Sequence, residues 1–224
     1  MNVCLLGDSL TSLILAKTLV NKKIKVDFFY SNLNKVNNNT RTIGISSNNI
    51  NFIKKEIISI DKKLLWEIDK IEIFDDFENN NKILNFKKFD DKLFYIIKNK
   101  EFYKLLNNSL KKNNNFKKIK IKNKLFYNKF IKKNNSQLVI NCDKKNEIYK
   151  KYFNKNFYKD YRSTAYSSII KHDKIRNHKA IQVFTKNGPI AFLPISEYET
   201  SIVYSAKNKS KKYFELTEKE FNKI

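Results

Sequence analysis

The residues with the clearest chemical spacing lie near the start of the chain, where Gly7, Ser9 and Ser12 follow an apolar run. They occupy the three glycine positions of the dinucleotide fingerprint G-x-G-x-x-G. In that motif the first glycine makes the turn, the second lets a pyrophosphate approach the backbone, and the third lets the helix pack on the strand. Only Gly7 keeps the glycine, although a serine hydroxyl could donate to a phosphate at the helix N-terminus. The motif predicts a weakened nucleotide site.

The end of the second expected strand carries Tyr30, where an acidic residue would bind the ribose hydroxyl groups. Asp27 lies three residues earlier, and an odd offset on a strand points its side chain to the opposite face. A tyrosine offers one hydroxyl group and no bidentate carboxylate. Tyr30 therefore counts against tight cofactor binding.

A βαβ unit is expected to position this loop, because apolar runs at residues 3–6 and 24–30 flank a helical apolar stripe at residues 10–20. Such a unit is parallel and right-handed. Further along, consecutive strands replace the alternation of strand and helix, which predicts a separate, mostly antiparallel sheet. The expected helices are 47–57 and 98–111, and the expected strands are 71–77, 83–89, 119–121, 125–131, 137–142, 163–171, 180–184, 190–193 and 200–205.

The formal net charge of +24 raises the question of a nucleic-acid partner. Of the 46 basic residues only Arg41, Arg162 and Arg176 are arginine. Proteins that recognise nucleic-acid bases and phosphates favour the guanidinium group of arginine. The lysines are dispersed among acidic and asparagine residues rather than gathered on one stripe. Heavy use of Lys, Asn, Ile and Phe is also typical of an A/T-rich genome. We therefore expect no specific nucleic-acid binding.

Cysteine and histidine provide no recognisable metal or redox motif. Cys4 and Cys142 each lie in an apolar run, which favours buried structural thiols. His172 and His178 are flanked by charged and amide residues, which indicates a solvated loop, so no metal site is expected. No acid–base pair stands out, and no catalytic residue is assigned.

Arg41 opens the run Arg-Thr-Ile-Gly-Ile-Ser before the helix expected from residue 47. This run resembles the R-[ST]-x-[AG]-[IL]-S segment of flavin-dependent aromatic-ring hydroxylases, in particular the ubiquinone-biosynthesis branch. Residues 138–143 resemble that family's strand ending in A-D-G, with Asp143 matching and Lys144 in place of the glycine. Residues 184–194 closely resemble the run F-x-x-x-G-P-[IL]-A-x-L-P. Residues 93–110 resemble a strand-to-helix segment reading G-Y-x-V-E-N-x-x-L, in which Asn99 is kept.

The resemblance covers about residues 2–222 and implies an α/β fold with interleaved domains. It implies a Rossmann-like FAD-binding domain from residues 1–70 and 98–150, and a mostly antiparallel β-sheet substrate domain from residues 71–97 and 151–210. The expected cofactor-binding residues, which should converge at the carboxyl edge of the parallel sheet, are Gly7, Ser9, Ser12, Arg41 and Asp143. The alternative for Arg41 is a surface arginine at the start of a helix.

The function implied by the resemblance is that of an FAD-dependent monooxygenase. Such enzymes take electrons from NADPH or NADH and hydroxylate an activated phenol ring, here a prenylated ubiquinone precursor. The second hypothesis is a non-catalytic relative that serves as a scaffold in a quinone-biosynthesis assembly. It is favoured by the two lost glycines, by Tyr30 and by Lys144. A lysine-rich nucleic-acid binder is the third hypothesis.

A capping box at Thr217 and Glu220 predicts a helix that starts near residue 218. Because only the beginning of this helix, within residues 211–224, is present and the family's G-D-A-x-H motif is absent, we interpret the chain as truncated. No run of about 18 apolar residues occurs. A cytoplasmic protein is therefore expected, with peripheral membrane contact left open.

Overall fold

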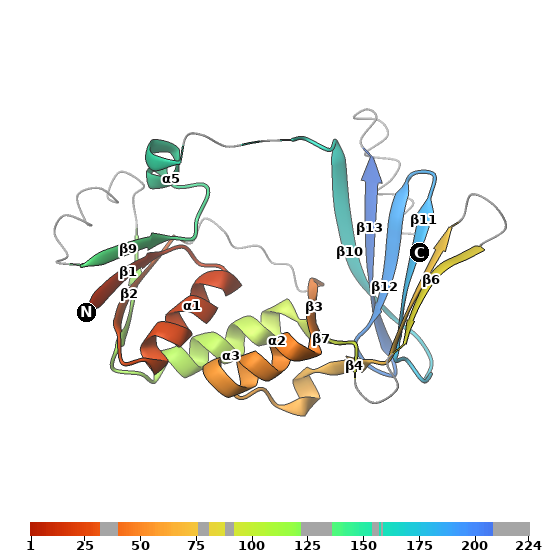
Figure 1. Cartoon of the computed structure of the whole chain (residues 1–224), viewed down its shortest axis with the longest axis horizontal. Coiled ribbons are helices and arrows are strands. Elements are labelled where there is room, and N and C mark those ends of the chain that lie inside the picture. Colours follow the sequence, from red (N-terminus) through yellow and green to blue (C-terminus); the bar gives the residue numbers. More distant parts are fainter. Residues whose placement is uncertain are drawn as a thin grey trace. The chain divides into compact units, whose positions relative to one another are not determined.

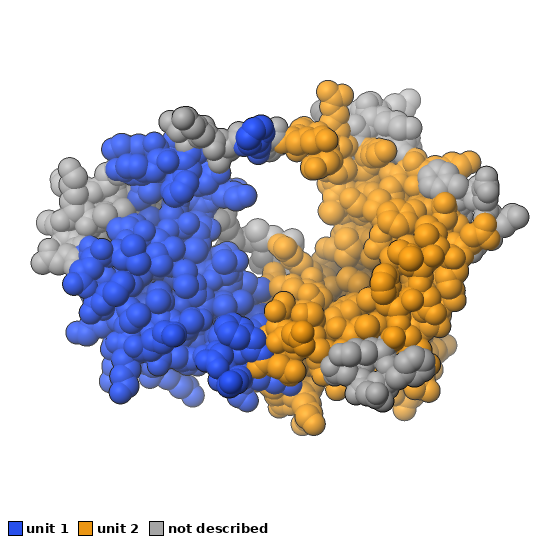
Figure 2. All heavy atoms as spheres, viewed as in Figure 1, with its two compact units in different colours: residues 1–37, 52–59, 100–157 blue, residues 38–51, 60–99, 158–224 orange. Residues whose placement is uncertain are grey.

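The computed structural model describes residues 1–31, 40–75, 81–87, 92–121, 136–153, 157 and 159–207 (Figure 1). The chain forms two compact units, and each is built from separate pieces of sequence. Unit 1 comprises residues 1–37, 52–59 and 100–157, and unit 2 comprises residues 38–51, 60–99 and 158–224 (Figure 2). Residues 38–51 and 60–70, expected in the cofactor-binding domain, belong to unit 2.

Unit 1 contains a four-stranded sheet in the order β8-β2-β1-β9. All three strand pairs are parallel, and Val3 lies opposite both Val26 and Leu138. The expected parallel pairing of the first two strands and its completion by a strand ending before Asp143 are therefore confirmed. The strands are β1 (Asn2–Leu6), β2 (Lys25–Tyr30), β8 (Phe116–Lys120) and β9 (Leu138–Asn141).

Helices of unit 1 bury the apolar stripes that the sequence predicts. In α1 (Leu10–Asn21) the buried apolar side chains recur with helical spacing at Leu13, Ala16 and Val20. In α3 (Asn99–Lys111) the buried positions are Phe102, Leu106 and Leu110, each four residues from the next. A short helix, α5 (Glu147–Tyr152), buries Ile148 against Cys4, Leu6 and Phe29.

The helix expected at 47–57 begins as α2 (Ser47–Phe52) and continues as the π-helical turn η2 (Ile53–Ile57). Its three isoleucines at positions 50, 53 and 57 are buried, as expected. The side-chain amide of Asn21 donates to the carbonyl groups of Glu56 and Ile57 at 3.1 and 2.8 Å. These bonds join the end of α1 to the end of η2. A 3-10 turn, η3 (Lys62–Leu64), follows.

Unit 2 contains a six-stranded sheet in the order β10-β13-β12-β11-β5-β6. Four of its five strand pairs are antiparallel, and β11 and β5 are parallel. The expected union of the strands after residue 163 with those between 71 and 89 is therefore confirmed. The strands are β5 (Lys70–Asp75), β6 (Asn81–Lys87), β10 (Ser163–Lys171), β11 (Lys179–Thr185), β12 (Gly188–Pro194) and β13 (Glu199–Lys207).

A second sheet in unit 2 has three antiparallel strands in the order β3-β7-β4. They are β3 (Thr42–Ser46), β7 (Phe94–Lys98) and β4 (Trp66–Ile68). Ile68 and Ile96 of this sheet form a buried cluster with Ala180 of the six-stranded sheet. The sequence did not predict β4, because three residues are too few to give a periodic pattern.

Gly188 makes the turn between β11 and β12 possible. Its φ is +136°, and a Cβ atom there would lie 1.8 Å from the carbonyl oxygen of Ser205. The Gly-Pro run that carries the closest family resemblance therefore has a packing role in this sheet. The strand expected at 125–131 and the helix expected from residue 218 lie outside the described residues. None of the described helices is long and apolar enough to cross a membrane.

Candidate functional site

The loop between β1 and α1 has the backbone shape that the fingerprint requires at its first position. Gly7 has a φ of +122°, and its N–H donates to the carbonyl oxygen of Phe29 on β2 at 2.9 Å. A Cβ atom at Gly7 would lie 3.2 Å from the carbonyl carbon of Cys142 and 3.4 Å from the Cβ of Asp143. Only glycine suits this position, because φ is positive and β9 runs close by.

Ser9 and Ser12 bond to each other across the first turn of α1. Ser9 is the N-cap: its Oγ accepts from the Ser12 amide at 3.2 Å, and the Ser12 Oγ accepts from the Ser9 amide at 3.4 Å. The two hydroxyl oxygens are 2.9 Å apart. The predicted serine contact with a phosphate group would therefore compete with a complete capping box. The amides of Leu10 and Thr11 keep no acceptor within the helix, because they belong to its first turn.

Asp143 lies beside this loop, with its Cβ 3.4 Å from the place that a Cβ atom would take at Gly7. Its Oδ1 accepts from the Lys145 amide at 2.9 Å, and its own amide donates to the Oδ1 of Asn141 at 3.1 Å. Among the described residues, a positive φ outside glycine occurs only at Lys23 and Arg162. The turn after β9 therefore forms with Lys144 in an ordinary conformation, and the missing glycine of the A-D-G motif does not distort it.

A polar cluster beside the loop was missed by the sequence reasoning. The Tyr103 hydroxyl of α3 donates to Asp8, and the ammonium of Lys118 on β8 lies 3.9 Å from the same carboxylate. Lys118 also donates to the Oδ1 of Asn107 at 3.0 Å and lies 4.6 Å from the centre of the Tyr30 ring. Tyr30, at the position where the fingerprint has an acid, thus lies beside the cation Lys118, which itself lies near Asp8.

Burial shapes the titration of this cluster. It raises the pKa of Tyr103, and the hydrogen bond to Asp8 adds to the rise. Burial also lowers the pKa of Lys118, while Asp8 acts in the opposite direction. Tyr103 therefore remains a neutral donor that holds the Asp8 side chain, and Lys118 is the cation of the cluster.

Arg41 belongs to unit 2, where its side chain is exposed at the start of β3. Its carbonyl oxygen accepts from the Asn99 amide at 2.9 Å, so two of the family-like segments meet here. The Oδ1 of Asn99 is buried and has no hydrogen-bond partner among the described residues. Of the five predicted cofactor residues, the structure brings Gly7, Ser9, Ser12 and Asp143 together in unit 1. Convergence of Arg41 with them stays a prediction.

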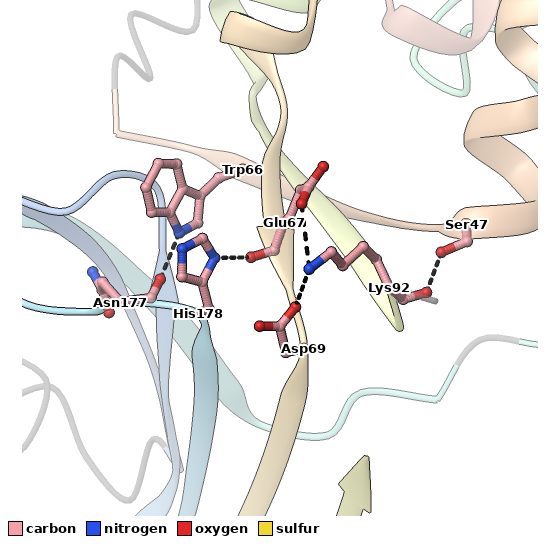
Figure 3. A network of polar contacts seen from close by, with 7 residues as sticks. All are labelled: Ser47, Trp66, Glu67, Asp69, Lys92, Asn177 and His178. Carbon is pink, nitrogen blue, oxygen red and sulfur yellow. Dashed lines mark hydrogen bonds and ion pairs between the residues drawn. The ribbon is translucent and has the colours of Figure 1, made fainter. Parts of the chain in front are cut away.

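The two histidines stand at the ends of a largely exposed loop, as the flanking residues predicted, but both also make polar contacts, and Figure 3 shows those of His178. The Nδ1 of His178 lies 2.8 Å from the carbonyl oxygen of Glu67, and its ring stacks on Trp66 with the ring centres 4.8 Å apart. His172 bonds to Thr200 at 3.0 Å. Asn177 between them is buried, and its amide donates to the carbonyl oxygen of Ser196 on the β12–β13 connection at 2.8 Å.

Lys92 completes the same network. Its ammonium lies 2.6 Å from Asp69 and 3.4 Å from Glu67, while its carbonyl oxygen accepts from the Ser47 hydroxyl (Figure 3). The hydrogen bond to Asp69 is the main reason that the pKa of Lys92 is raised. Within the described part of the chain, no group of three or more His, Cys, Asp or Glu side chains could hold a metal ion. The network joins the two sheets of unit 2 and has no evident catalytic geometry.

Comparison with known proteins gives a similarity of fold. No protein-family model matches the chain, and no curated protein matches its sequence. PqsL, a probable FAD-dependent monooxygenase from Pseudomonas aeruginosa, matches 92% of this chain and 60% of its own, with a TM-score of 0.68 and 10% identity. CtdE, solved in complex with FAD and a substrate, matches 94% of this chain and 58% of its own, with a TM-score of 0.67 and 14% identity.

A geranylgeranyl bacteriochlorophyll reductase-like protein from Thermoplasma acidophilum matches 92% of this chain and 56% of its own, with a TM-score of 0.64 and 13% identity. The chain therefore has the mixed α/β fold found in FAD-dependent monooxygenases. It spans about 60% of the length of the first of these structures. At such low identities the similarity concerns the fold.

Proposed function

We propose that this chain is part of an FAD-dependent monooxygenase that hydroxylates an aromatic ring of a ubiquinone precursor, with NADPH or NADH as reductant. The observation that carries the proposal is Gly7, which turns the chain from β1 of a parallel sheet into α1 at a positive φ. Structures of similar fold include one solved with FAD. The ubiquinone branch rests on the Arg41 and Gly188 segments of the sequence.

The residues present fit part of the FAD molecule. The turn at Gly7 and the amides of Leu10 and Thr11 suit a pyrophosphate group at a helix N-terminus. Tyr30 and Lys118 do not suit the ribose hydroxyl groups, because neither offers a carboxylate. When bound, FAD supplies the oxygen-activating redox chemistry. In this chain Gly7, Ser9, Ser12, Arg41 and Asp143 would hold it, and no catalytic side chain is assigned.

The second candidate is a non-catalytic relative that keeps the fold and acts as a scaffold in a quinone-biosynthesis assembly. The specific observation in its favour is the pair of hydroxyl bonds between Ser9 and Ser12, which occupies the Ser12 amide at the helix N-terminus. The cation at Lys118 favours it too. Peripheral contact with a membrane is compatible with either candidate, since the proposed substrate is a prenylated phenol.

Titration of the purified chain with FAD tests the proposal. We expect weak, saturable binding with a dissociation constant above about 10 μM, equivalent to less than about 7 kcal/mol of binding free energy. The flavin absorption bands should shift on binding, which distinguishes a specific site from adsorption. A folded protein that leaves the flavin spectrum unchanged at millimolar FAD would favour the scaffold. Binding near or below about 1 μM would show that the serine and tyrosine substitutions cost less than we infer.

A further inference from the structure

The loop after β1 brings a carboxylate close to the position where the fingerprint has an acid. The Gly7 amide donates to the carbonyl oxygen of Phe29 at 2.9 Å, and the register of β1 and β2 places Leu6 opposite Phe29. Asp8 and Tyr30 therefore lie just beyond this bond, on neighbouring strands whose backbones are about 5 Å apart. A carboxylate at Asp8 thus starts one strand away from the place where Tyr30 offers none.

Two contacts fix the direction of the Asp8 side chain. The Tyr103 hydroxyl of α3 donates to its Oδ1, and the Lys118 ammonium of β8 lies 3.9 Å from the same oxygen atom. Lys118 also lies 4.6 Å from the centre of the Tyr30 ring. The ammonium group is therefore a neighbour of both side chains, and Asp8 points towards the strands β2 and β8.

The second carboxylate oxygen of Asp8 is available to a ligand. Both contacts use Oδ1, and no hydrogen bond or ion pair within the described part of the chain uses Oδ2. The side chain is 22% exposed, so a molecule from solvent can reach it. Each carboxylate oxygen has two acceptor sites. The 2′- and 3′-hydroxyl groups of a ribose supply two neighbouring donors, which Oδ2 can accept.

We propose that Asp8 is the residue that binds the ribose hydroxyl groups of an adenosine nucleotide, in place of the acid that position 30 lacks. Tyr103 and Lys118 act as positioning residues for its carboxylate. The inference rests on the proposed function and deepens it, because it names the residue that recognises the adenosine half of FAD. In this interpretation the carboxylate of the fingerprint has moved from the end of β2 to the neighbouring loop.

The two positioning residues also limit the cost of a negative charge at this loop. A carboxylate near a pyrophosphate repels it, and the ammonium of Lys118 offsets this repulsion. Burial and the bond to Asp8 raise the pKa of Tyr103, so its hydroxyl stays protonated and donates at neutral pH. Asp8 can therefore accept from a ribose without excluding the phosphate groups of the same nucleotide.

A comparison of two ligands by isothermal calorimetry tests the proposal. ADP carries both ribose hydroxyl groups, whereas 2′,3′-dideoxy-ADP lacks them and has the same adenine and phosphate groups. We expect the wild-type protein to bind ADP at least about tenfold more tightly, because hydrogen bonds to charged groups are among the stronger ones. This preference should fall at least about threefold in Asp8→Asn and disappear in Asp8→Ala.

Inorganic pyrophosphate separates the ribose contact from the charge of Asp8. Because pyrophosphate has no ribose, its affinity should stay the same or rise in Asp8→Asn. Asp173→Asn is the matched control, since it makes the same change at an exposed aspartate of unit 2, and it should leave the preference for ADP unchanged. An equal fall in the affinities for all three ligands in Asp8→Asn would indicate damage to the loop and would overturn the proposal.

Tyr103→Phe tests the positioning role. Loss of the hydroxyl releases the carboxylate, so the preference for ADP over dideoxy-ADP should fall at least about threefold. Equal losses of affinity for the two ligands would indicate a purely structural role and contradict the assignment. Tyr198→Phe, at an exposed tyrosine of unit 2, is the control and should change neither affinity. Circular dichroism verifies that each variant is folded, and Asp8→Asn decides if Asp8→Ala is not.

Equal affinities of the wild-type protein for ADP and dideoxy-ADP would overturn the proposal, and so would a failure of ADP to bind. A preference that Asp8→Asn leaves unchanged in a folded protein would also overturn it. The FAD titration distinguishes these failures from failure of the proposed function. FAD binding without a preference for ADP leaves the flavin function intact. A preference that depends on Asp8, without FAD binding, would count against the flavin function and support the role of Asp8.

Discussion

The hydroxyl oxygens of Ser9 and Ser12 lie 2.9 Å apart, and each hydroxyl accepts a hydrogen bond from the backbone amide of the other residue. In a glycine fingerprint the same two positions carry no side chain: the second glycine lets a pyrophosphate approach the backbone, and the third lets the helix pack on the strand. Two substitutions that look like independent losses in the sequence therefore form one stabilising unit. Removing both serines should affect helix stability and nucleotide access in opposite directions.

The double variant Ser9→Gly/Ser12→Gly tests this coupling. We expect FAD to bind more tightly, by about tenfold or more, because relief of crowding at such positions is worth on the order of 1–3 kcal/mol. The free energy of unfolding should fall by roughly 1 kcal/mol as the capping box is lost. Both quantities are measured on the same preparations, by calorimetry and by urea unfolding. An unchanged FAD affinity would argue against a fingerprint at this loop.

Replacing each of the three glycines by alanine should destabilise the protein, and the loss of stability should differ among the three variants. Gly188→Ala should cost most, more than about 3 kcal/mol, because the new Cβ would meet a backbone oxygen at 1.8 Å and φ is positive. Gly7→Ala should cost about 1–3 kcal/mol, from its positive φ and contacts at 3.2 Å. Gly44→Ala is the control, since only the Phe94 ring must move. A cost at Gly44 as large as that at Gly7 would contradict the assignment.

Acid should destabilise unit 2 through Glu72. Its pKa in the folded protein lies far below its ordinary value of about 4.5, so the ionised form stabilises the folded state. This contribution is complete above the unfolded pKa and is lost as the pH falls from about 4.5 towards the folded pKa. Wild-type protein should lose stability more steeply below pH about 4.5 than Glu72→Gln. Parallel slopes in urea titrations across this range would contradict the prediction.

The two cysteines should react with thiol reagents at different rates. Burial, with a smaller contribution from Asp27, raises the pKa of Cys4 to about 12, and its side chain is 1% exposed. Burial also raises the pKa of the half-buried Cys142, while a hydrogen bond with Ser12 opposes this rise. At pH about 8 we expect slow labelling of Cys142 and almost none of Cys4, because the thiolate is the reactive form.

Mass spectrometry after timed labelling with an alkylating reagent resolves the two sites. In urea both cysteines should react quickly and at similar rates, which serves as the internal control. Fast labelling of Cys4 under native conditions would show that β1 opens readily. Because β1 also carries the turn to Gly7, such opening would argue against a pre-formed nucleotide loop.

The sequence predicted the parallel sheet and the mostly antiparallel sheet because their strands carry strong local patterns. Residues 3–6 form an apolar run buried on both faces, and the stripe from Leu13 to Val20 faces the same core. It did not predict the pairing of β3 with β7, since that pairing depends on contacts between distant segments. Four of the five residues predicted to bind the cofactor lie together, because strand ends in a parallel sheet share one edge.

Tyr103 and Lys118 could not be found from sequence patterns, since neither belongs to a motif. Tyr103 lies on α3 between buried apolar positions, and Lys118 is one of three lysines on β8, which reads Phe-Lys-Lys-Ile-Lys. Only the crossing of the helix over the sheet brings them to Asp8. The ion pairs of Glu72 with Lys70, Lys82 and Lys179 were missed for a similar reason, because the strand register decides which lysines become its neighbours.

The alternation of the two units along the chain has a consequence for its synthesis. β1 pairs with β9, so the sheet of unit 1 can be completed only after Leu138, the partner of Val3, has been synthesised. At a translation rate of about 5–20 residues per second, the apolar edge of β1 remains unpaired for roughly 7–27 s after it is made. During this time most of unit 2 is also unfinished, because four of its six large-sheet strands follow residue 158. Nascent chains of this protein should therefore depend on a chaperone at the ribosome for most of their synthesis.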